Sequence, residues 1–414
     1  MIDHEENKKE ATRCLKCKKS RCSSACAVHT DVPEAMKLFL EGRKEEAAKM
    51  LFDNNPLSAI TCQVCDWKRM CFGHCILNVK KVPIRWYEVE QEISSLDYLK
   101  SVRLQCAPDN GKKVSIIGAG PAGIVAAIEL LQKGFAVTMF DEHERVGGVL
   151  RYGIPEFRLD NAYIDEYERI LKEAGLKFKG RVQIGKNISL KVIRSLSDAV
   201  LIATGADVPR RMNIPGEDNP HVIPALKYLD NPDAYVLGRK VFVVGGGNVA
   251  MDASRTAAKN GHDTTLIYRK DFDNMPANTI EVEEAMKDGV QFRVLQTPVE
   301  IKSDGERNIA VMKDCQTVVK PDGQLSTEIL DGTEREVEFD DMIIAVSETV
   351  DFGIFGQEKP ETIGGNGCPK VNGIQQTSFS DVFLAGDFLY GPKTVVMAVH
   401  SAKIAVQGIV EYLS

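Results

Sequence analysis

The sequence of 414 residues lacks a long apolar run, an excess of positive charge and an even spread of cysteine. No apolar stretch reaches the roughly 18 residues that a membrane-spanning helix needs, and the first residues, MIDHEENKKEATR, lack the apolar core of a secretory signal. Lysine and arginine number 52 against 59 aspartate and glutamate, so no general surface for nucleic acid is indicated. We therefore expect a cytoplasmic protein without membrane insertion and without a nucleic-acid partner.

Cysteine is scarce in most of the chain but concentrated near its start. Two runs occur there, Cys14-x2-Cys17-x4-Cys22-x3-Cys26 and Cys62-x2-Cys65-x5-Cys71-x3-Cys75. Cytosolic thiols stay reduced, so such runs are more often metal ligands or redox groups than disulfides. Ligation of iron–sulfur clusters would use most of these thiols. A zinc site formed by the first pair of cysteines of each run would leave the other four cysteines without a role. A third interpretation is that the thiols are buried and inert. His74 lies within the second run and is more simply a surface residue than a ligand.

A dinucleotide fingerprint begins with the apolar stretch Val114 to Ile117. Gly118-x-Gly120-x-x-Gly123 follows it, then a helical pattern up to Gly134, then a second strand that ends at Asp141. Glycines allow the tight turn and a close backbone approach, the helix N-terminus faces a pyrophosphate, and the acid binds a ribose hydroxyl. This order of elements predicts a dinucleotide site.

A second fingerprint lies 127 residues further on, with Gly245-x-Gly247-x-x-Ala250 after an apolar strand. Two sites in one chain indicate one flavin nucleotide and one nicotinamide nucleotide. The strand after the second fingerprint ends in Tyr268-Arg269-Lys270 and has no acid there. Arg269, with Lys270 or Arg255, suits a 2′-phosphate, which favours NADP(H) over NAD(H); the alternative is a solvated charged turn.

The chain as a whole resembles the small (β) subunit of bacterial glutamate synthase. It is also similar to the large subunit of NADH-dependent ferredoxin:NADP oxidoreductase and to the N-terminal half of dihydropyrimidine dehydrogenase. The stretches that carry the resemblance are DNNPLSAIT, GGVLRYGIPEFRL at 147–159, LIATGADVPRRMNIPGE at 201–217, GGGNVAMDASRTA at 245–257 and FLAGD at 383–387. The resemblance extends from about Cys14 to the end of the sequence.

This resemblance implies an α/β fold with two nested Rossmann-like domains behind a small α-helical iron–sulfur domain. The implied divisions are residues 1–100 for the helical domain, 101–205 with 345–414 for a split FAD domain, and 206–344 for an inserted NAD(P) domain. Implied FAD-binding residues are Gly118, Gly120, Pro121, Ala122, Gly123, Asp141, Glu142, Gly148, Arg151, Thr204, Gly205, Gly386, Asp387, Thr394 and Val395. Implied NADP-binding residues are Gly245, Gly247, Asn248, Val249, Ala250, Arg255, Arg269 and Lys270.

The resemblance also implies two [4Fe-4S] clusters whose ligands are exchanged between the cysteine runs. Cys14, Cys17 and Cys22 would bind the first cluster together with Glu90, and Cys26, Cys65, Cys71 and Cys75 would bind the second. Cys62 stands where relatives have no ligand, so it is a spare thiol or a substitute ligand. Ser347, in the stretch AVSE, replaces a glycine that relatives have near the nicotinamide site, and Ala402 replaces a glycine of the last helix.

The function that the resemblance implies is electron transfer in a multi-subunit oxidoreductase. NAD(P)H would deliver a hydride to FAD, and the clusters would exchange single electrons with one or more redox partner subunits of a hetero-oligomeric complex. No redox-active Cys-x-x-Cys lies in the nicotinamide-binding part. Two alternatives stay open: a self-sufficient NAD(P)H diaphorase or oxidase with a structural N-terminal metal domain, and a catalytically silent docking subunit.

Overall fold

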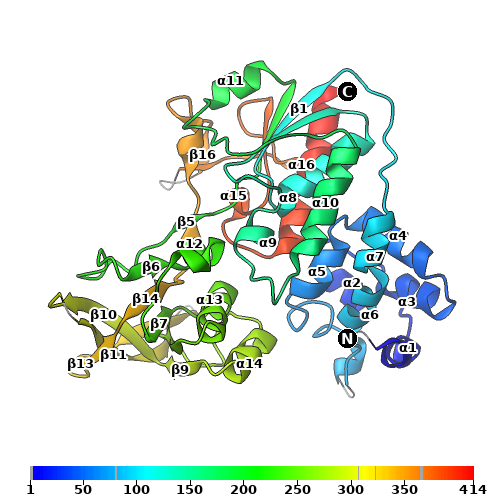
Figure 1. Cartoon of the computed structure of the whole chain (residues 1–414). Helices are drawn as coiled ribbons and strands as arrows, with labels where there is room; N and C mark the ends of the chain where they lie inside the picture. The colour runs from blue at the N-terminus through cyan, green and yellow to red at the C-terminus, as the bar shows by residue number, and fades with distance from the viewer. Residues whose placement is uncertain (1–2, 80–81, 306, 322, 364–366) are drawn as a thin grey trace. The chain divides into compact units, whose positions relative to one another are not determined.

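The computed structural model describes residues 3–79, 82–305, 307–321, 323–363 and 367–414 (Figure 1). The chain forms two compact units. Unit 1 comprises residues 1–151, 156–206 and 350–414, and unit 2 comprises residues 152–155 and 207–349. The three-domain division expected from the sequence stays a prediction.

The N-terminal part of unit 1 is entirely helical. Its elements are α1 (His4–Arg13), α2 (Arg21–Ala25), α3 (Val32–Leu40), α4 (Lys44–Asn54), α5 (Ser58–Val64), the 3-10 helix η1 (Ile76–Val79), α6 (Trp86–Ile93) and α7 (Leu96–Ser101). Asp31 caps α3 by accepting a hydrogen bond from the Glu34 N–H, and Pro33 lies in the first turn. Buried side chains such as Met36, Leu51 and Trp86 form a core between α3, α4 and α6. Most cysteines of the two runs lie in the connections between these short helices, whereas Cys22 lies in α2 and Cys62 in α5.

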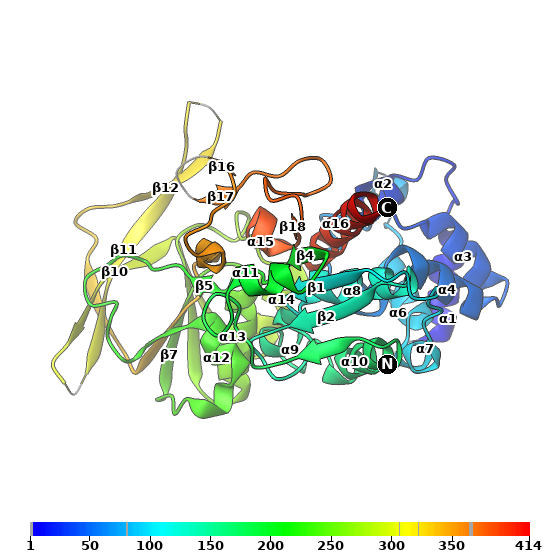
Figure 2. The same cartoon turned by 90° about the horizontal axis from the view of Figure 1, so that it is seen from above.

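The remainder of unit 1 is a five-stranded sheet of order β18-β4-β1-β2-β3 in which all neighbouring strands are parallel. The strands are β1 (Lys113–Ile117), β2 (Ala136–Phe140), β3 (Lys177–Lys179), β4 (Ala199–Ile202) and β18 (Val382–Leu384). The helices are α8 (Pro121–Gln132), α9 (Val149–Tyr152, whose last residue belongs to unit 2), α10 (Asn161–Glu173), α11 (Leu190–Ser195), η3 (Phe352–Phe355), α15 (Asp387–Tyr390) and α16 (Val395–Leu413), and β16 (Thr362–Ile363) pairs with β17 (Cys368–Pro369). The apolar helices α8 and α16 lie side by side against this sheet (Figures 1 and 2). A parallel sheet needs such cover on its faces because its strands are apolar on both sides.

Unit 2 holds a second parallel sheet of order β6-β14-β7-β8-β9. Its strands are β6 (Val222–Pro224), β7 (Lys240–Val244), β8 (Asp263–Tyr268), β9 (Gln291–Val294) and β14 (Asp341–Ile344), with α12 (Ala225–Asp230), η2 (Pro232–Ala234), α13 (Asn248–Lys259) and α14 (Thr279–Lys287). A separate antiparallel sheet contains β10 (Gln296–Ser303), β11 (Asn308–Val319), β12 (Leu325–Ile329) and β13 (Arg335–Phe339). The short strands β5 (Val208–Pro209) and β15 (Glu348–Thr349) pair where the chain enters and leaves this unit.

Within unit 1, specific polar contacts hold the helical part against the sheet part. The buried Tyr167 hydroxyl donates to the Pro56 carbonyl at 2.7 Å, and Lys403 Nζ donates to the Asn54 carbonyl at 2.5 Å. Arg169 Nη2 donates to the Leu99 carbonyl at 3.0 Å. The donors come from two helices, α10 and α16, so they fix the orientation of the cysteine-bearing part relative to the first sheet.

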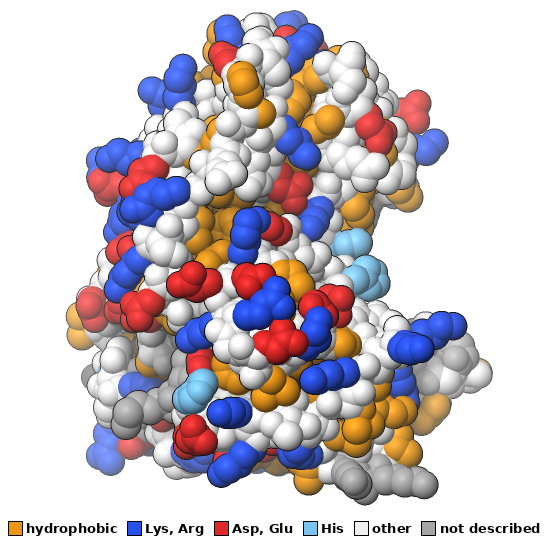
Figure 3. Space-filling model, turned by 90° about the vertical axis from the view of Figure 1, so that its right-hand side faces the viewer, with side chains coloured by type: hydrophobic (Ala, Val, Ile, Leu, Met, Phe, Trp, Pro, Cys, Tyr) orange, Lys and Arg blue, Asp and Glu red, His pale blue; other side chains and the backbone are white. Residues whose placement is uncertain are grey.

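The α/β fold with two Rossmann-like sheets and an N-terminal helical part confirms the fold class expected from the sequence. None of the helices described is long and apolar enough to cross a membrane. Figure 3 shows basic and acidic side chains interspersed with hydrophobic ones over one face of the molecule.

Candidate functional site

The turn between β1 and α8 contains one glycine that the fold itself does not need. A Cβ on Gly118 would lie 2.2 Å from the Ala203 carbonyl oxygen, and one on Gly123 would lie 2.0 Å from the Gly118 carbonyl oxygen. A Cβ on Gly120 would meet nothing closer than 3.9 Å, and its backbone, with φ −77° and ψ −168°, suits any residue. Protein packing therefore requires the first and third glycines, whereas the middle one keeps space open at the N-terminus of α8.

The turn between β7 and α13 repeats this arrangement. A Cβ on Gly245 would lie 2.3 Å from the Ala345 carbonyl oxygen, and one on Gly246 would lie 2.4 Å from the Tyr268 ring. A Cβ on Gly247 would meet nothing within 4 Å, and φ is −91° there. Open space at the N-terminus of a buried helix, beside a glycine turn, is the arrangement that receives a pyrophosphate.

The acid expected to bind ribose lies at the first turn. Asp141 is buried at the end of β2, and its Oδ2 accepts a hydrogen bond from the Ala119 N–H at 2.7 Å. Its Oδ1 accepts from the His143 N–H at 2.8 Å. The carboxylate is therefore held against the glycine turn, while the neighbouring Glu142 is exposed.

Three segments distant in sequence adjoin the same turn. Residues 203–205, which include Thr204 and Gly205, follow β4, and the Ala203 carbonyl lies against Gly118. A Cβ on Gly148 would lie 2.7 Å from Gly120 Cα, and one on Gly386 would lie 3.1 Å from Ala122 Cβ. The sequence therefore identified segments that the fold brings together around the N-terminus of α8.

The start of α16 adds polar groups at this edge of the sheet. Thr394 is the N-cap, Val395 begins the helix, and Thr394 Oγ1 is buried without a hydrogen-bond partner among the residues described. Burial raises the pKa of the Asp387 carboxyl to about 6, although the Lys393 N–H and ammonium group oppose this. An orphaned hydroxyl and a desolvated carboxyl are polar groups that a polar ligand would satisfy.

Arg151 has partners within the protein. Its Nη2 lies 2.6 Å from Asp165 Oδ1, and its Nε donates to the Val146 carbonyl at 2.9 Å. The guanidinium therefore anchors the loop before α9 to α10, and its expected contact with a cofactor stays a prediction.

In the second sheet the structure corrects the expectation for Arg255. Its side chain is buried inside unit 2, with Nη1 2.6 Å from Glu281 and Nε 2.8 Å from Asp288. Glu284 lies 3.7 Å away as a third carboxylate. This guanidinium has three carboxylate partners, so it joins α13 to α14 and is not available for a phosphate. The sequence could not reveal these partners because they lie about 30 residues away from Arg255.

Arg269 and Lys270 differ from Arg255 in this respect. Arg269 is exposed directly after β8, and Lys270 is half-buried beside it. Neither pairs with a carboxylate within the part of the chain that the structure describes. Asn248 Oδ1 accepts a hydrogen bond from the Asn278 N–H at 2.8 Å, so Asn248 positions the loop before α14, while Val249 is half-buried and Ala250 is buried in the core.

Ser347 has a backbone conformation that glycine adopts more easily. Its φ is +89°, in the left-handed region, and its carbonyl accepts a hydrogen bond from the Arg210 N–H at 3.1 Å. The serine therefore occupies a conformation that favours glycine, at a cost of about 1–3 kcal/mol.

Five thiols line one hollow in the helical part. Cys14, Cys17, Cys22 and Cys75 all lie in its wall, together with Cys71. Burial raises the pKa of the Cys14 thiol, and the nearby Cys17 and Cys75 thiols raise it further. Burial likewise raises the pKa of Cys22, with a contribution from Cys14 and Cys75. Cys75, from the second run, thus lies with the first three cysteines of the first run.

A second group of donors lies around Glu90 on α6. Burial raises the pKa of the Cys65 and Cys71 thiols, and for both the next cause is the Glu90 carboxylate, followed by other thiols including Cys26. Burial also raises the pKa of Glu90 itself to about 8. In the structure Cys75 thus lies with Cys14, Cys17 and Cys22, and Glu90 lies with Cys65 and Cys71, which differs from the grouping expected from the sequence. Cys75 directly precedes η1, and Glu90 lies on α6.

Cys62 belongs to the second group. Its thiol is buried, donates to the Ala59 carbonyl at 3.4 Å, and has its pKa raised by burial and then by Glu90 and Cys65. The zinc interpretation would require Cys62 beside Cys14, and the structure places them in different groups. His74 donates through Nδ1 to the Met70 carbonyl at 2.8 Å. Within the described residues, no three His, Cys, Asp or Glu side chains meet at a point suited to one metal ion.

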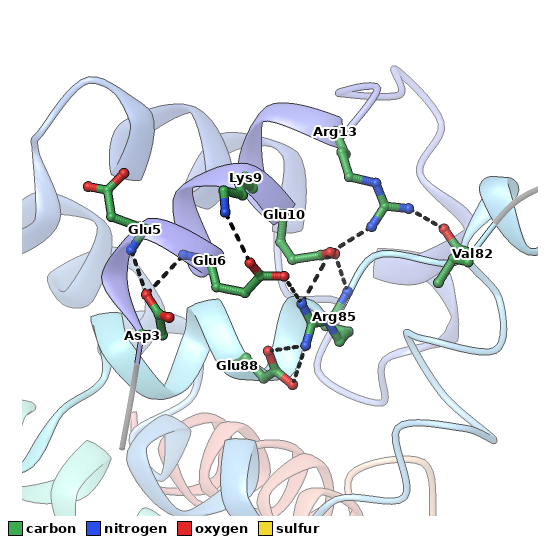
Figure 4. A network of polar contacts seen from close by, with 9 residues as sticks. All are labelled: Asp3, Glu5, Glu6, Lys9, Glu10, Arg13, Val82, Arg85 and Glu88. Atoms are coloured by element: carbon green, nitrogen blue, oxygen red, sulfur yellow. Dashed lines mark hydrogen bonds and ion pairs between the residues drawn. The ribbon is translucent and has the colours of Figure 1, made fainter.

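A polar network missed by the sequence analysis connects the two cysteine-bearing segments (Figure 4). Glu10, which is buried, accepts from Arg13 Nη1 at 2.6 Å and from the Arg85 N–H at 3.0 Å. Arg13 Nη2 also donates to the Val82 carbonyl at 2.5 Å. Arg13 precedes Cys14, and Arg85 begins the helix that carries Glu90, so Glu10 fixes the distance between both donor groups. No sequence signal distinguishes it from the exposed acids of α1.

Two family models match the chain. Residues 112–402 match "Pyridine nucleotide-disulphide oxidoreductase", and residues 1–101 match dihydropyrimidine dehydrogenase domain II, 4Fe-4S cluster. The second match covers both cysteine runs and Glu90.

Curated relatives match along nearly the whole length. The chain is 32% identical to the glutamate synthase [NADPH] small chain of Escherichia coli (strain K12), over 98% of this chain and 91% of that protein. It is 34% identical to the glutamate synthase [NADPH] small chain of Halomonas elongata, over 98% and 90%. Among solved structures, FprA of Mycobacterium tuberculosis in complex with NADPH matches with a TM-score of 0.64 at 19% identity, over 74% of this chain and 85% of that one, which shows a shared fold.

Proposed function

Because the chain belongs to the glutamate synthase small-chain family, and is therefore an NAD(P)H-dependent flavoprotein oxidoreductase with a 4Fe-4S domain, we propose that it is the electron-transfer subunit of a larger complex. The observation that carries the proposal is that one compact unit contains both the glycine turn with its open N-terminus and the two groups of thiols. When bound, FAD accepts a hydride from a nicotinamide nucleotide and releases electrons singly to iron–sulfur clusters.

We propose that the FAD lies at the N-terminus of α8. Gly120 leaves the space that a pyrophosphate needs, and the first N–H groups of α8 point into it. Asp141 already holds the turn through the Ala119 N–H, so its carboxylate is positioned for a ribose hydroxyl. The buried Thr394 hydroxyl and the desolvated Asp387 carboxyl supply further polar contacts at this edge.

We propose two iron–sulfur clusters with ligand sets revised by the structure. Cys14, Cys17, Cys22 and Cys75 line one hollow and supply four thiolates, as a [4Fe-4S] cluster requires. Cys26, Cys65 and Cys71 supply three thiolates to the other, and the Glu90 carboxylate is the fourth ligand. Cys62 is a buried thiol beside this second set and stays outside it.

We propose NADP(H) as the nicotinamide nucleotide, bound at the N-terminus of α13 with its 2′-phosphate on Arg269 and Lys270. The support is that both cations follow β8 without a carboxylate partner in the described part of the chain. An Arg269→Ala variant is expected to raise KM for NADPH about tenfold or more and to leave KM for NADH unchanged, because a charge-assisted hydrogen bond contributes about 1.5–3 kcal/mol. Steady-state reduction of a dye with both nucleotides measures this.

Arg255→Leu is the matched control for Arg269. It leaves Glu281 and Asp288 buried without their cation, so it is expected to lower the stability of unit 2 by about 3–5 kcal/mol, visible in urea unfolding. KM for NADPH of the folded variant is expected to stay at the wild-type value. A selective loss of NADPH affinity in Arg255→Leu, with unchanged stability, would return Arg255 to the nucleotide site.

The proposed function is tested by anaerobic purification of the full chain. We expect FAD, about eight irons per chain for two clusters, and bleaching of the flavin absorbance by NADPH. A protein without flavin and iron would contradict the proposal. A protein with flavin and zinc in place of iron would support a diaphorase with a structural metal domain instead.

A further inference from the structure

Four exposed apolar side chains come from two short segments next to the cysteines. Leu15 is 61% exposed between Cys14 and Cys17, and Ile76, Val79 and Val82 are 42%, 67% and 65% exposed after Cys75. Large apolar side chains exposed together, and not singly, indicate a surface that another molecule covers. We call these four residues the apolar patch.

The members of the apolar patch are linked to one hollow of the helical part. Leu15 and Ile76 both line the hollow that contains Cys14, Cys17, Cys22 and Cys75. Val79 ends η1, the same short helix that Ile76 begins. The Val82 carbonyl accepts a hydrogen bond from Arg13, the residue directly before Cys14 (Figure 4). Two members of the apolar patch therefore lie in the wall of the thiol-lined hollow, and the other two are connected to it through η1 and through Arg13.

Cations without partners border the apolar patch. Lys16, Lys18, Lys19 and Arg21 are all exposed, and no carboxylate among the described residues forms an ion pair with any of them. Lys19 and Arg21 line the same hollow as Leu15 and Ile76. No acid occurs between Arg13 and Cys22, although the whole chain carries a net charge of −7. These four cations therefore form a local cluster of positive charge beside the hollow, on a protein that is acidic as a whole.

We propose that the apolar patch and its four cations form the docking surface for a carrier protein that has an acidic surface and a one-electron centre of its own. The inference rests on the proposed function, because it assigns the route by which electrons enter or leave the thiol-bound cluster. One electron passes between the two centres, and no bond or proton is transferred. An acidic partner follows from charge complementarity, and the apolar patch provides the area that excludes water at the contact.

The proposal predicts a marked dependence on charge and salt. Association between complementary charged surfaces is faster at low ionic strength, because exposed charges are screened beyond about 8 Å at 0.15 M salt. An acidic [2Fe-2S] ferredoxin is the probe, and a basic c-type cytochrome is the control carrier. We expect the ferredoxin to bind the holoprotein at least about tenfold more tightly than the cytochrome, and to lose this preference at high salt.

The variant that tests the surface is Lys18→Glu with Lys19→Glu. It is expected to weaken ferredoxin binding at least about tenfold, and to remove the carbodiimide cross-links that mass spectrometry should find at these two lysines in the wild type. The matched control is Lys177→Glu with Lys179→Glu on β3, since both lysines are exposed and the net charge changes equally. The control is expected to bind ferredoxin as the wild type does.

The apolar part is tested separately by Val79→Ser with Val82→Ser. Both side chains are largely exposed, so iron content and thermal unfolding should not change, while ferredoxin binding should weaken about threefold or more. If this variant binds ferredoxin as tightly as the wild type does, the apolar side chains do not contribute and only charge attracts the carrier, which would overturn the proposal. A dimer that dissociates in this variant would show that a second copy covers the patch, and would also overturn it.

Failure of the docking surface can be distinguished from failure of the proposed function. Flavin and iron content and bleaching by NADPH are measured on every variant before binding. If these hold but both carriers bind equally, or the cross-links map to β3, only the docking surface is wrong. If iron is missing from the wild type, the proposed function itself fails.

Discussion

A Gly120→Val variant is expected to fold and to be purified without FAD. The position has a backbone conformation that valine adopts freely, and the added Cβ meets no protein atom closer than Gly148 Cα at 3.9 Å, an ordinary contact. It would instead fill the space that the pyrophosphate needs at the N-terminus of α8. Overpacking costs about 1–3 kcal/mol even in an adaptable core, so FAD affinity should fall at least about ten- to hundredfold. Flavin absorbance per chain measures the loss.

Two variants control for this prediction. Gly373→Val changes an exposed glycine that has nothing within 4 Å of its Cβ and no positive φ, and it should retain full flavin. Gly247→Val should retain flavin but no longer be reduced by NADPH, because the same space is filled at α13 instead. Full FAD content in Gly120→Val would show that the cofactor does not lie at this turn. Circular dichroism confirms that each variant is folded.

Cys75→Ser and Cys14→Ser are expected to remove the same cluster signal in electron paramagnetic resonance. Both thiols line one hollow, so loss of either should reduce iron from about eight to about four per chain. Cys65→Ser and Glu90→Ala are expected to perturb the other signal, since both residues belong to the second donor group. Spectra of the four dithionite-reduced variants sort the ligands into two sets.

Glu92→Ala is the matched control for Glu90→Ala. Glu92 lies two residues further on the same helix and is equally buried, but its oxygens bind His4 Nδ1 at 2.7 Å and Asn7 Nδ2 at 2.8 Å. Its substitution should leave both cluster signals unchanged. If Glu90→Ala instead changed the signal that Cys14→Ser removes, the ligand sets expected from the sequence would be right and the revised sets wrong.

The glycine fingerprints show what sequence alone can predict here. Strand, turn and helix are consecutive in the chain, so the positions of Gly118, Gly120 and Gly123 could be read directly from their order. The sequence could not show which of these glycines leaves space for a ligand, because the answer depends on contacts with Ala203 and Gly148 from elsewhere in the fold. The sequence also predicted the second sheet and its glycine turn for the same reason.

Arg255 and Cys75 show where the sequence is insufficient. Arg255 appeared available for a phosphate because its partners Glu281 and Asp288 come from another helix. The resemblance grouped Cys75 with Cys26, Cys65 and Cys71, whereas in the structure it lies in the hollow with Cys14, Cys17 and Cys22, because spacing within a run does not say which run a residue will face. In both cases contacts between segments distant in sequence decide which groups a side chain lies beside.

The central claim, that electrons move within this chain between a nicotinamide nucleotide and iron–sulfur clusters through FAD, is tested most directly by electron stoichiometry. The holoprotein is fully reduced with dithionite, freed of excess reductant and mixed anaerobically with NADP+. FAD stores two electrons and two clusters store one each, so the account predicts about two NADPH formed per chain as the cluster signals disappear. About one NADPH per chain, with the cluster signals persisting, would contradict it.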